Sequence, residues 1–460
     1  MNTWQDLVTA SLIGTERAVV PAVQIPGRPA GDDAAAGSSR SDPADVLLGR
    51  AALLTAARRA GRMPDHAEPL PAAGPDPRPA VGPAAGRRLA RMLGGEHPDL
   101  LTEWLTAAVT RGLRPPAQLL PALLDRARRV SPADPELRRL AVQAGGARAR
   151  WLAGLNPDWT FAADEPGQAR TRERGQDAWR LGDAGQRRGY LTTLRAADPD
   201  AARDLAAASW DKAGAGERVM FLSVLAADPT GTTGTTGTTG LSRADEPLLE
   251  AALDDRADDV RSWAAYLLTT LPGSALGQRM ADRALRCLRI ERGIRGTRLI
   301  ASPPAECDAA MRRDGIAPGP GAGRSQLADR TRLMLEVVAR TPLRTWTHAF
   351  AMPPATIVTV RSGDWAPVLF TGWSRAAIAQ RDQDWMTALI NEAVTGRPPG
   401  SAAENGALSQ LARRADPALG APDVLADPEP GVPLAVRDTI RVLRFRYEMG
   451  KELDDEHSGG

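Results

Sequence analysis

The stretch Arg187–Leu288 contains one pattern three times: Arg188-Gly-Tyr-Leu-Thr-Thr-Leu before Asp198-Pro199, Arg218-Val-Met-Phe-Leu-Ser-Val-Leu before Asp228-Pro229, and Arg261-Ser-Trp-Ala-Ala-Tyr-Leu-Leu before Leu271-Pro272. In every copy the proline stands eleven residues after the arginine. The copies begin 30 and then 43 residues apart, and the Gly/Thr tract Gly231–Gly240 accounts for the longer interval. Paired helices that repeat every ~30–45 residues are typical of an α-solenoid, whose units bury their apolar faces by stacking.

We therefore predict an all-α fold: a HEAT-like α-solenoid of stacked antiparallel helix pairs with flexible Pro/Gly-rich loops. Three regions are expected along the 460 residues: N-terminal helices with low-complexity linkers over 1–82, a helical-repeat domain over 83–300, and a C-terminal helical region over 301–460 that continues the solenoid. Ala355–Val360 is rich in β-branched residues, which favour strands. Because no second such run exists to pair with it, we interpret it as helix or extended loop.

The clearest repeat is Leu248–Leu288, where two apolar helical runs flank the turn Asp254–Asp259. An aspartate in this turn is expected to cap the second helix, and Val260 and Trp263 are expected to face the core. The tract Gly231–Gly240 should form an exposed loop. Six leucines of the three copies should be buried at equivalent positions: Leu191, Leu194, Leu222, Leu225, Leu267 and Leu268.

Composition and charge point to an ordinary globular protein of the cytoplasm. Basic and acidic residues nearly cancel, at 58 and 56, so no overall field attracts nucleic acid or a membrane. Two cysteines do not make a disulfide framework, which indicates a reducing compartment. The first residues carry an acid where a signal peptide needs positive charge, and no apolar run is long enough to span a bilayer.

No catalytic constellation is evident in the sequence. The segment Gly319–Ser325 resembles a phosphate loop only superficially, because Arg324 stands where lysine belongs and no apolar strand precedes it. A Gly-x-Ser-x-Gly elbow is missing as well. The histidines lie far apart without a second ligand at metal spacing: His66, His97, His348 and His457. The sequence therefore predicts no catalytic residue, no cofactor and no metal site, and it favours a non-enzymatic protein.

Arginines recur at steps of three and four from Arg279 to Arg298, directly after an acidic run from Asp245 to Asp259. The first of them share a broad helical face, where they could contact phosphate or an acidic protein. The favoured interpretation is a solvated surface in which neighbouring helices pair these arginines with the acidic run. Four are kept as candidate partner-binding residues: Arg279, Arg283, Arg286 and Arg289.

Tryptophan is unusually frequent, with eleven residues against five phenylalanines and three tyrosines. Tryptophans on apolar helical stripes are expected in the core. Four crowd a C-terminal stretch, from Trp346 to Trp385. Core is the favoured interpretation for each, but Trp365 and Trp373 are kept as candidate anchors of a partner-binding groove.

Several motifs together resemble those of a bacterial family of unknown function that is widespread in actinomycetes. They are Leu12-Ile-Gly-Thr-Glu-Arg17, the Arg-x-x-x-Leu-x-x-Leu-x-x-x-Asp-Pro copies, Leu271-Pro-Gly-Ser274 with Arg279-Met280, and Pro303-Pro304 before Arg313-Asp-Gly-Ile316. The resemblance covers most of the chain and implies a HEAT-type helical-repeat protein without a catalytic motif. In that family, related genes tend to lie beside genes for a MoxR-type AAA+ ATPase, a von Willebrand A-domain protein and a SWIM zinc-finger protein. The resemblance thus implies a scaffold in a chaperone-like assembly.

Two functional hypotheses follow from the sequence. The first is a non-enzymatic adaptor whose concave face holds a protein partner, with the AAA+ ATPase or the von Willebrand A-domain protein as candidates. The alternative is a nucleic-acid-binding solenoid, including one that acts on bases as HEAT-like alkylpurine glycosylases do. This alternative rests on the arginines and tryptophans described above. It predicts that binding to duplex DNA weakens steeply between low and physiological salt.

Overall fold

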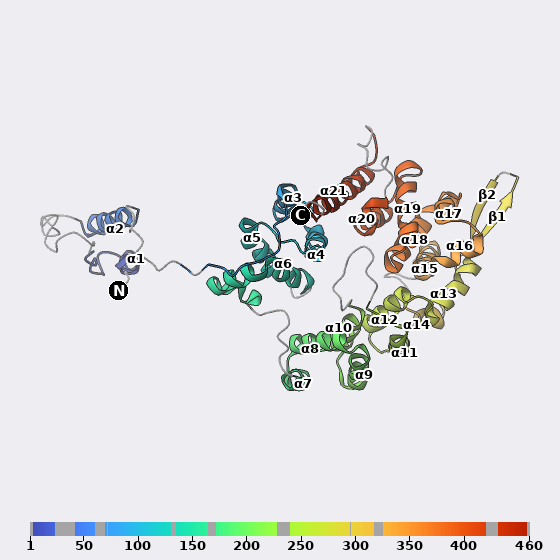
Figure 1. Cartoon of the computed structure of the whole chain (residues 1–460), viewed down its shortest axis with the longest axis horizontal. Helices are drawn as coiled ribbons and strands as arrows, with labels where there is room; N and C mark the ends of the chain where they lie inside the picture. Colours follow the sequence, from blue (N-terminus) through green and yellow to red (C-terminus); the bar gives the residue numbers. More distant parts are fainter. Residues whose placement is uncertain are drawn as a thin grey trace. The chain divides into compact units, whose positions relative to one another are not determined.

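The computed structural model describes residues 3–23, 42–59, 70, 72–129, 135–163, 172–227, 240–294, 296–316, 325–419 and 431–457. It divides the chain into two compact units, 1–72 and 73–460 (Figure 1). The described residues are mostly helical, as the sequence predicts, with one two-stranded hairpin among them. The expected loop Gly231–Gly240 lies outside the described residues apart from Gly240.

The helices follow one another along the chain, joined by short turns and 3-10 segments. Within the described ranges, no helix is both long and apolar enough to cross a bilayer. The α-helices are α1 (Thr3–Ile13), α2 (Pro43–Arg59), α3 (Pro83–Leu93), α4 (Leu101–Thr110), α5 (Leu120–Arg129), α6 (Pro135–Leu155), α7 (Arg172–Leu181), α8 (Ala184–Ala197), α9 (Pro199–Ser209), α10 (Ala215–Ala226), α11 (Glu246–Ala252), α12 (Asp258–Thr270), α13 (Ala275–Cys287), α14 (Ala309–Arg313), α15 (Gln326–Arg340), α16 (Arg344–Phe350), α17 (Pro354–Thr359), α18 (Ala366–Gln380), α19 (Gln383–Thr395), α20 (Ala402–Arg414) and α21 (Leu434–His457).

The smaller unit is built from α1 and α2, which pack on each other. Its core consists of Leu7 and Ala10 on α1, Val23 after it, and Leu47 on α2. Arg50 of α2 donates to the backbone carbonyl oxygens of residues 20 and 21, which ties the chain after α1 to α2. This unit therefore has its own apolar core.

The three copies of the sequence pattern correspond to α8, α10 and α12. α10 contacts both α8 and α12, and α8 and α12 also pack on the short helices α7, α9 and α11. Of the six leucines expected in the core, five are buried, and Leu194 is half-buried. Repetition in the sequence is thus matched by helices that lie side by side in space.

The prediction for Trp263 is wrong. Its side chain is 37% exposed, whereas Val260 is fully buried as predicted. With 3.6 residues per turn, the buried stripe of α12 runs through Val260, Ala264 and Leu268, and Trp263 falls on its flank beside Tyr266. The apolar spacing predicted the helix correctly, but it wrongly assigned the Trp263 ring to the buried stripe instead of its flank.

The turn before α12 also differs from the expectation that an aspartate caps the helix. The N-cap is Ala257, which has no polar side chain. Asp255 instead accepts from the Ala257 backbone N–H at 2.8 Å and forms an ion pair with Arg218 of α10 at 3.0 Å. The aspartate therefore joins neighbouring copies of the repeat, since both charged side chains are almost fully buried.

A β-hairpin follows α13 and was not predicted. Strand β1 (Leu288–Gly293) pairs antiparallel with β2 (Gly296–Ala301), and Leu288 lies opposite Ala301. Gly296 has φ = 99°, a conformation that L-residues other than glycine rarely adopt. By contrast, the helical interpretation of Ala355–Val360 is confirmed, because α17 spans Pro354–Thr359.

A large apolar core runs from α10 to α21. α18 packs closely on α15 because Gly372 has no Cβ. A Cβ built there would lie 2.7 Å from Cγ1 of Val338.

The last helix, α21, connects two cores. Its first half joins the large core through Val436 and Ile440. Its second half belongs to a separate core with α3, α4 and α5, through Phe445, Met449 and Leu453. The last helix of the unit therefore packs against its first helices.

Candidate partner-binding site

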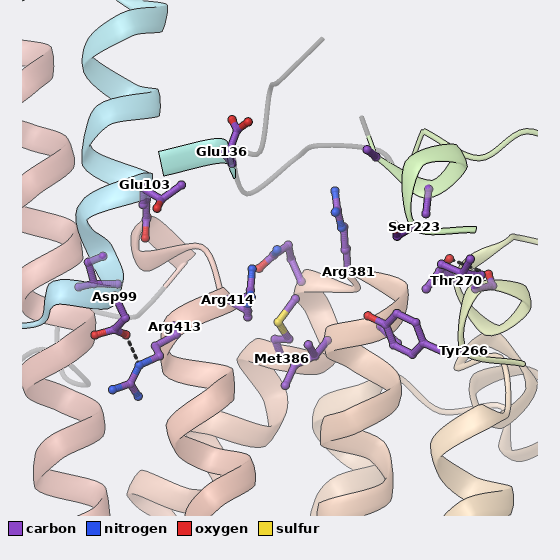
Figure 2. Close-up of a pocket in the computed structure, with 18 of the residues that line it drawn as sticks. Asp99, Glu103, Glu136, Ser223, Tyr266, Thr270, Arg381, Met386, Arg413 and Arg414 are labelled. Atoms are coloured by element: carbon purple, nitrogen blue, oxygen red, sulfur yellow. Dashed lines mark hydrogen bonds and ion pairs between the residues drawn. The ribbon is translucent and has the colours of Figure 1, made fainter. Parts of the chain in front are cut away.

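A cavity of about 660 Å³ opens within the unit 73–460 (Figure 2). Its walls come from the 3-10 turn Pro98–Leu100, from α4, α6, α10 and α12, and from α18 to α21. Cavities of about 300–1,000 Å³ are typical of ligand sites. Helices that lie far apart in the sequence thus line one half-open space, whose volume falls in this range.

Two aromatic rings of α12 form one side of this cavity. Trp263 and Tyr266 are 37% and 48% exposed, and their rings meet edge to face with centroids 5.5 Å apart. Tyr266 extends from α12 toward the side of the cavity that carries Met386 (Figure 2). Leu267 and Met386 also line the cavity and are buried. The cavity lining therefore combines the exposed ring surface of this pair with buried apolar side chains.

The carboxylates that line the cavity already have arginine partners. No group of three His, Cys, Asp or Glu side chains among the described residues is arranged to hold a metal ion. The ion pairs are Asp99 with Arg413, Glu103 with Arg446 at 2.8 Å, and Glu136 with Arg139 at 2.7 Å. These negative charges are therefore largely neutralised by the protein itself.

Two arginines of the cavity lack such a partner. Arg381 and Arg414 are exposed, and neither forms an ion pair with any residue that the structure describes. Both side chains extend from the ends of α18 and α20 toward the open space (Figure 2). The two guanidinium groups give the cavity a net positive charge, because the other charges in its lining are paired.

Arg381 also has an unusual backbone. It is the C-cap of α18 with φ = 53° and ψ = 35°, in the left-handed region. Glycine is the usual residue at such a helix end, since a Cβ in this conformation is sterically unfavourable. An arginine here thus keeps a charged side chain at the cavity at some cost in backbone energy.

Comparison with known protein families gives a match over most of the chain. Residues 6–421 match the family model of DUF5691, a family of unknown function. The chain belongs to this family. The match includes both units but ends before α21, whose Arg446 lines the cavity. Searches of curated proteins and of solved structures found no match.

The candidate arginines of this DUF5691 chain fall into two groups. Arg279 pairs with Asp314 at 2.7 Å and with Glu250 at 3.1 Å, and Arg283 pairs with Asp314 at 2.5 Å. The predicted pairing with the acidic run is confirmed for Arg279 through Glu250, whereas Arg283 pairs with Asp314, which lies outside that run. Arg286 lies in the last turn of α13 and Arg289 lies on β1, and both are exposed. The row is therefore not one helical face, and none of the four lines the cavity.

The two candidate tryptophans also lie outside the cavity. Trp373 is only 3% exposed and packs between the rings of Trp346 and Trp385, with centroids 6.4 and 5.5 Å away. Trp365 is half-buried against the same core. The crowding of tryptophans in the C-terminal stretch thus produces an aromatic core, which was the favoured interpretation.

Sequence reasoning missed the residues that do meet at the cavity. Tyr266 stands in the third copy of the repeated pattern without a predicted role, and Arg381 and Arg414 stand in no recognised motif. One signal was available: Trp263 and Tyr266 are three residues apart, so they share a helix face. Which helices face this pair across the cavity depends on contacts between distant segments.

Proposed function

We propose that this chain is a non-enzymatic, cytoplasmic adaptor whose stacked helix pairs form a HEAT-like solenoid that binds a protein partner at the cavity. The contacts of α10 with α8 and α12 support a repeat architecture, because each copy packs on its neighbours. The family resemblance makes an AAA+ ATPase of the MoxR type or a von Willebrand A-domain protein the first candidates for the partner.

The observation that carries this proposal is the exposed aromatic pair, Trp263 and Tyr266. Large aromatic side chains are usually buried, and exposed ones in a concave site are typical anchors of protein interfaces. Elsewhere in α12 the apolar residues Val260, Ala264 and Leu268 are fully buried. The helix thus keeps two large rings at the cavity although it has a well-formed buried face.

The nucleic-acid alternative has weaker support. It depended on a continuous row of free arginines, and Arg279 and Arg283 are occupied by Asp314 and Glu250. Arg289 lies on a strand, so it does not extend the helical row. A duplex is held mainly by many contacts to its phosphates, and such a track requires more unpaired basic side chains in one line.

A pull-down with matched variants tests the adaptor proposal. The tagged chain, the double variant Trp263→Ala with Tyr266→Ala, and Tyr447→Ala are purified gently from the native host. Tyr447 is the control because its ring is also exposed but does not line the cavity. We expect a stoichiometric protein with the wild type and with Tyr447→Ala, and its loss with the double variant. Equal recovery by all three, or by none, would contradict the proposal.

A further inference from the structure

We infer that the segment held in the cavity is an acidic peptide with an aromatic or aliphatic side chain beside its carboxylates. This inference rests on the proposed function, since it names the chemistry of the partner at the same site. It is drawn from two features that meet there: the free arginines Arg381 and Arg414, and the aromatic pair Trp263 and Tyr266. Each feature selects a different part of the ligand.

The charge balance selects an anion. Each carboxylate in the lining is paired with an arginine, whereas Arg381 and Arg414 have no partner among the described residues. A guanidinium group binds a carboxylate through two parallel hydrogen bonds, which gives both strength and orientation. Two such groups facing one cavity therefore match a segment that carries two or more carboxylates.

The backbone at Arg381 supports a role for its side chain in binding. The chain offers a natural comparison: Ala351 caps α16 with φ = 53° and ψ = 43°, nearly the same conformation as Arg381. Ala351 is exposed and does not line the cavity. At both positions glycine would relieve the left-handed backbone, but only at Arg381 would it also remove a charge from the cavity.

The apolar part of the cavity lining selects an apolar group. Trp263 and Tyr266 present ring surface, and the buried side chains Leu267 and Met386 lie in the same lining. An aromatic or leucine side chain placed there removes ring surface from water and gains contact with these residues. The ligand therefore needs acidic and apolar groups within a short length, because the cavity measures about 660 Å³.

A single-stranded nucleic acid also combines negative charge with flat rings, but the lining fits it less well. Asp99, Glu103 and Glu136 all border the cavity, and their ion pairs with Arg413, Arg446 and Arg139 leave only Arg381 and Arg414 of the lining unpaired among the described residues. A nucleic-acid strand carries a charge at every phosphate and is held by a continuous basic groove. A peptide can place its few carboxylates at Arg381 and Arg414 alone.

Fluorescence anisotropy on the purified full chain tests the ligand chemistry. The probe is the fluorescein-labelled peptide Asp-Glu-Phe-Asp-Glu, compared with versions in which lysines replace the acids or alanine replaces the phenylalanine, and with a labelled oligothymidylate. We expect saturable binding of the first peptide, weakened by added salt, and at least about tenfold weaker binding of the other peptides. Tighter binding of the oligothymidylate, or equal binding of all peptides, would overturn the inference.

Two glycine variants then separate binding from folding. Arg381→Gly should weaken the acidic peptide about tenfold while the melting temperature stays equal or rises. Ala351→Gly should raise the melting temperature similarly and leave peptide affinity unchanged. Unchanged affinity in both Arg381→Gly and Arg414→Gln would overturn the inference. If the pull-down shows a partner that requires Trp263 and Tyr266 but the acidic peptide does not bind, the inference fails and the adaptor proposal stands.

Discussion

Arg446 on α21 donates from Nε and Nη2 to both carboxylate oxygens of Glu103 on α4, a residue 343 positions earlier in the chain. Its Nη1 also donates to the backbone carbonyl oxygen of Ala412 on α20 at 2.9 Å. The Arg446 side chain is 1% exposed, so this guanidinium group is almost completely removed from water. One arginine thus joins α21, α20 and α4 at the wall of the cavity.

Replacing Arg446 with alanine should destabilise the unit 73–460 by about 3–5 kcal/mol. The reason is that the substitution leaves the Glu103 carboxylate and the carbonyl oxygen of Ala412 without this donor. Arg441→Ala is the control on the same helix, because its ion pair with Asp438 is exposed and contributes less than about 0.5 kcal/mol. Urea unfolding followed by circular dichroism measures both. Similar midpoints for the two variants would contradict this role of Arg446.

Two tryptophans should respond very differently to truncation. Trp346 is fully buried, so Trp346→Ala should cost about 3–5 kcal/mol through the cavity it leaves. Trp263→Ala should cost only about 0.5–1.5 kcal/mol, mainly the lost ring contact with Tyr266. Thermal or urea unfolding of both variants provides the comparison. A loss at Trp263 as large as that at Trp346 would place Trp263 in the core after all.

These tryptophans illustrate what periodicity can and cannot predict. The repeated spacing located α8, α10 and α12, because the apolar stripe of a helix is a local property of the sequence. Trp263 lies on the flank of that stripe, where burial depends on whether another helix covers it. The hairpin at β1 and β2 was missed because its arginines continue the helical spacing of α13. A turn signal, Gly293-Ile-Arg-Gly296, was present in the sequence.

Substitutions in and around the row of arginines from Arg279 to Arg298 should differ in their effect on the free energy of unfolding. Asp314 is buried and pairs with Arg279 and Arg283, so Asp314→Ala should destabilise the protein by about 3 kcal/mol. This loss is at the lower end of the range of about 3–5 kcal/mol for breaking a buried ion pair, because Arg279 keeps its pair with Glu250. Arg289→Ala should change stability by less than about 0.5 kcal/mol, since the side chain is exposed on β1. Equal effects in urea unfolding would refute this division.

Glu404 should make part of the stability depend on pH. Burial favours the neutral carboxyl and is the largest single influence, but hydrogen bonds from Arg397, Gly400 and Ser401 outweigh it and hold the pKa of Glu404 below its ordinary 4.5. A lowered folded-state pKa means that the stabilisation is present above about pH 4.5 and is lost as the pH falls through the folded-state value. Glu404→Gln should therefore be less stable than the wild type at pH 7.

The same comparison at acidic pH gives the check. Below the folded-state pKa, Glu404 is protonated in both states, so the difference in urea midpoint between wild type and Glu404→Gln should shrink. A difference that stays constant from neutral to acidic pH would show that the carboxylate charge is not what stabilises the start of α20. The capping pair of Ser401 and Glu404 would then act through shape and neutral hydrogen bonds alone.

The cavity itself was beyond prediction from the sequence. Tyr266 and Arg381 are 115 residues apart, and Arg446 lies farther still along the chain. Local patterns predict which residues form each helix, but which ends of α12, α18 and α20 face one cavity follows from packing across the whole unit. The pair of Arg279 with Glu250 could be predicted because the acidic run directly precedes the arginines, but Asp314, which pairs with Arg283, follows the hairpin and was not predicted.

Photo-crosslinking from position 266 tests the central claim most directly. Tyr266 is replaced with p-benzoylphenylalanine in the native host, the cells are irradiated, and the products are identified by mass spectrometry. The same probe at Tyr447, which is exposed outside the cavity, is the control. We predict one dominant protein product from position 266, linked through an acidic segment and lost when Arg381→Gly is added. No specific product at position 266, or the same products from both positions, would contradict partner binding at this cavity.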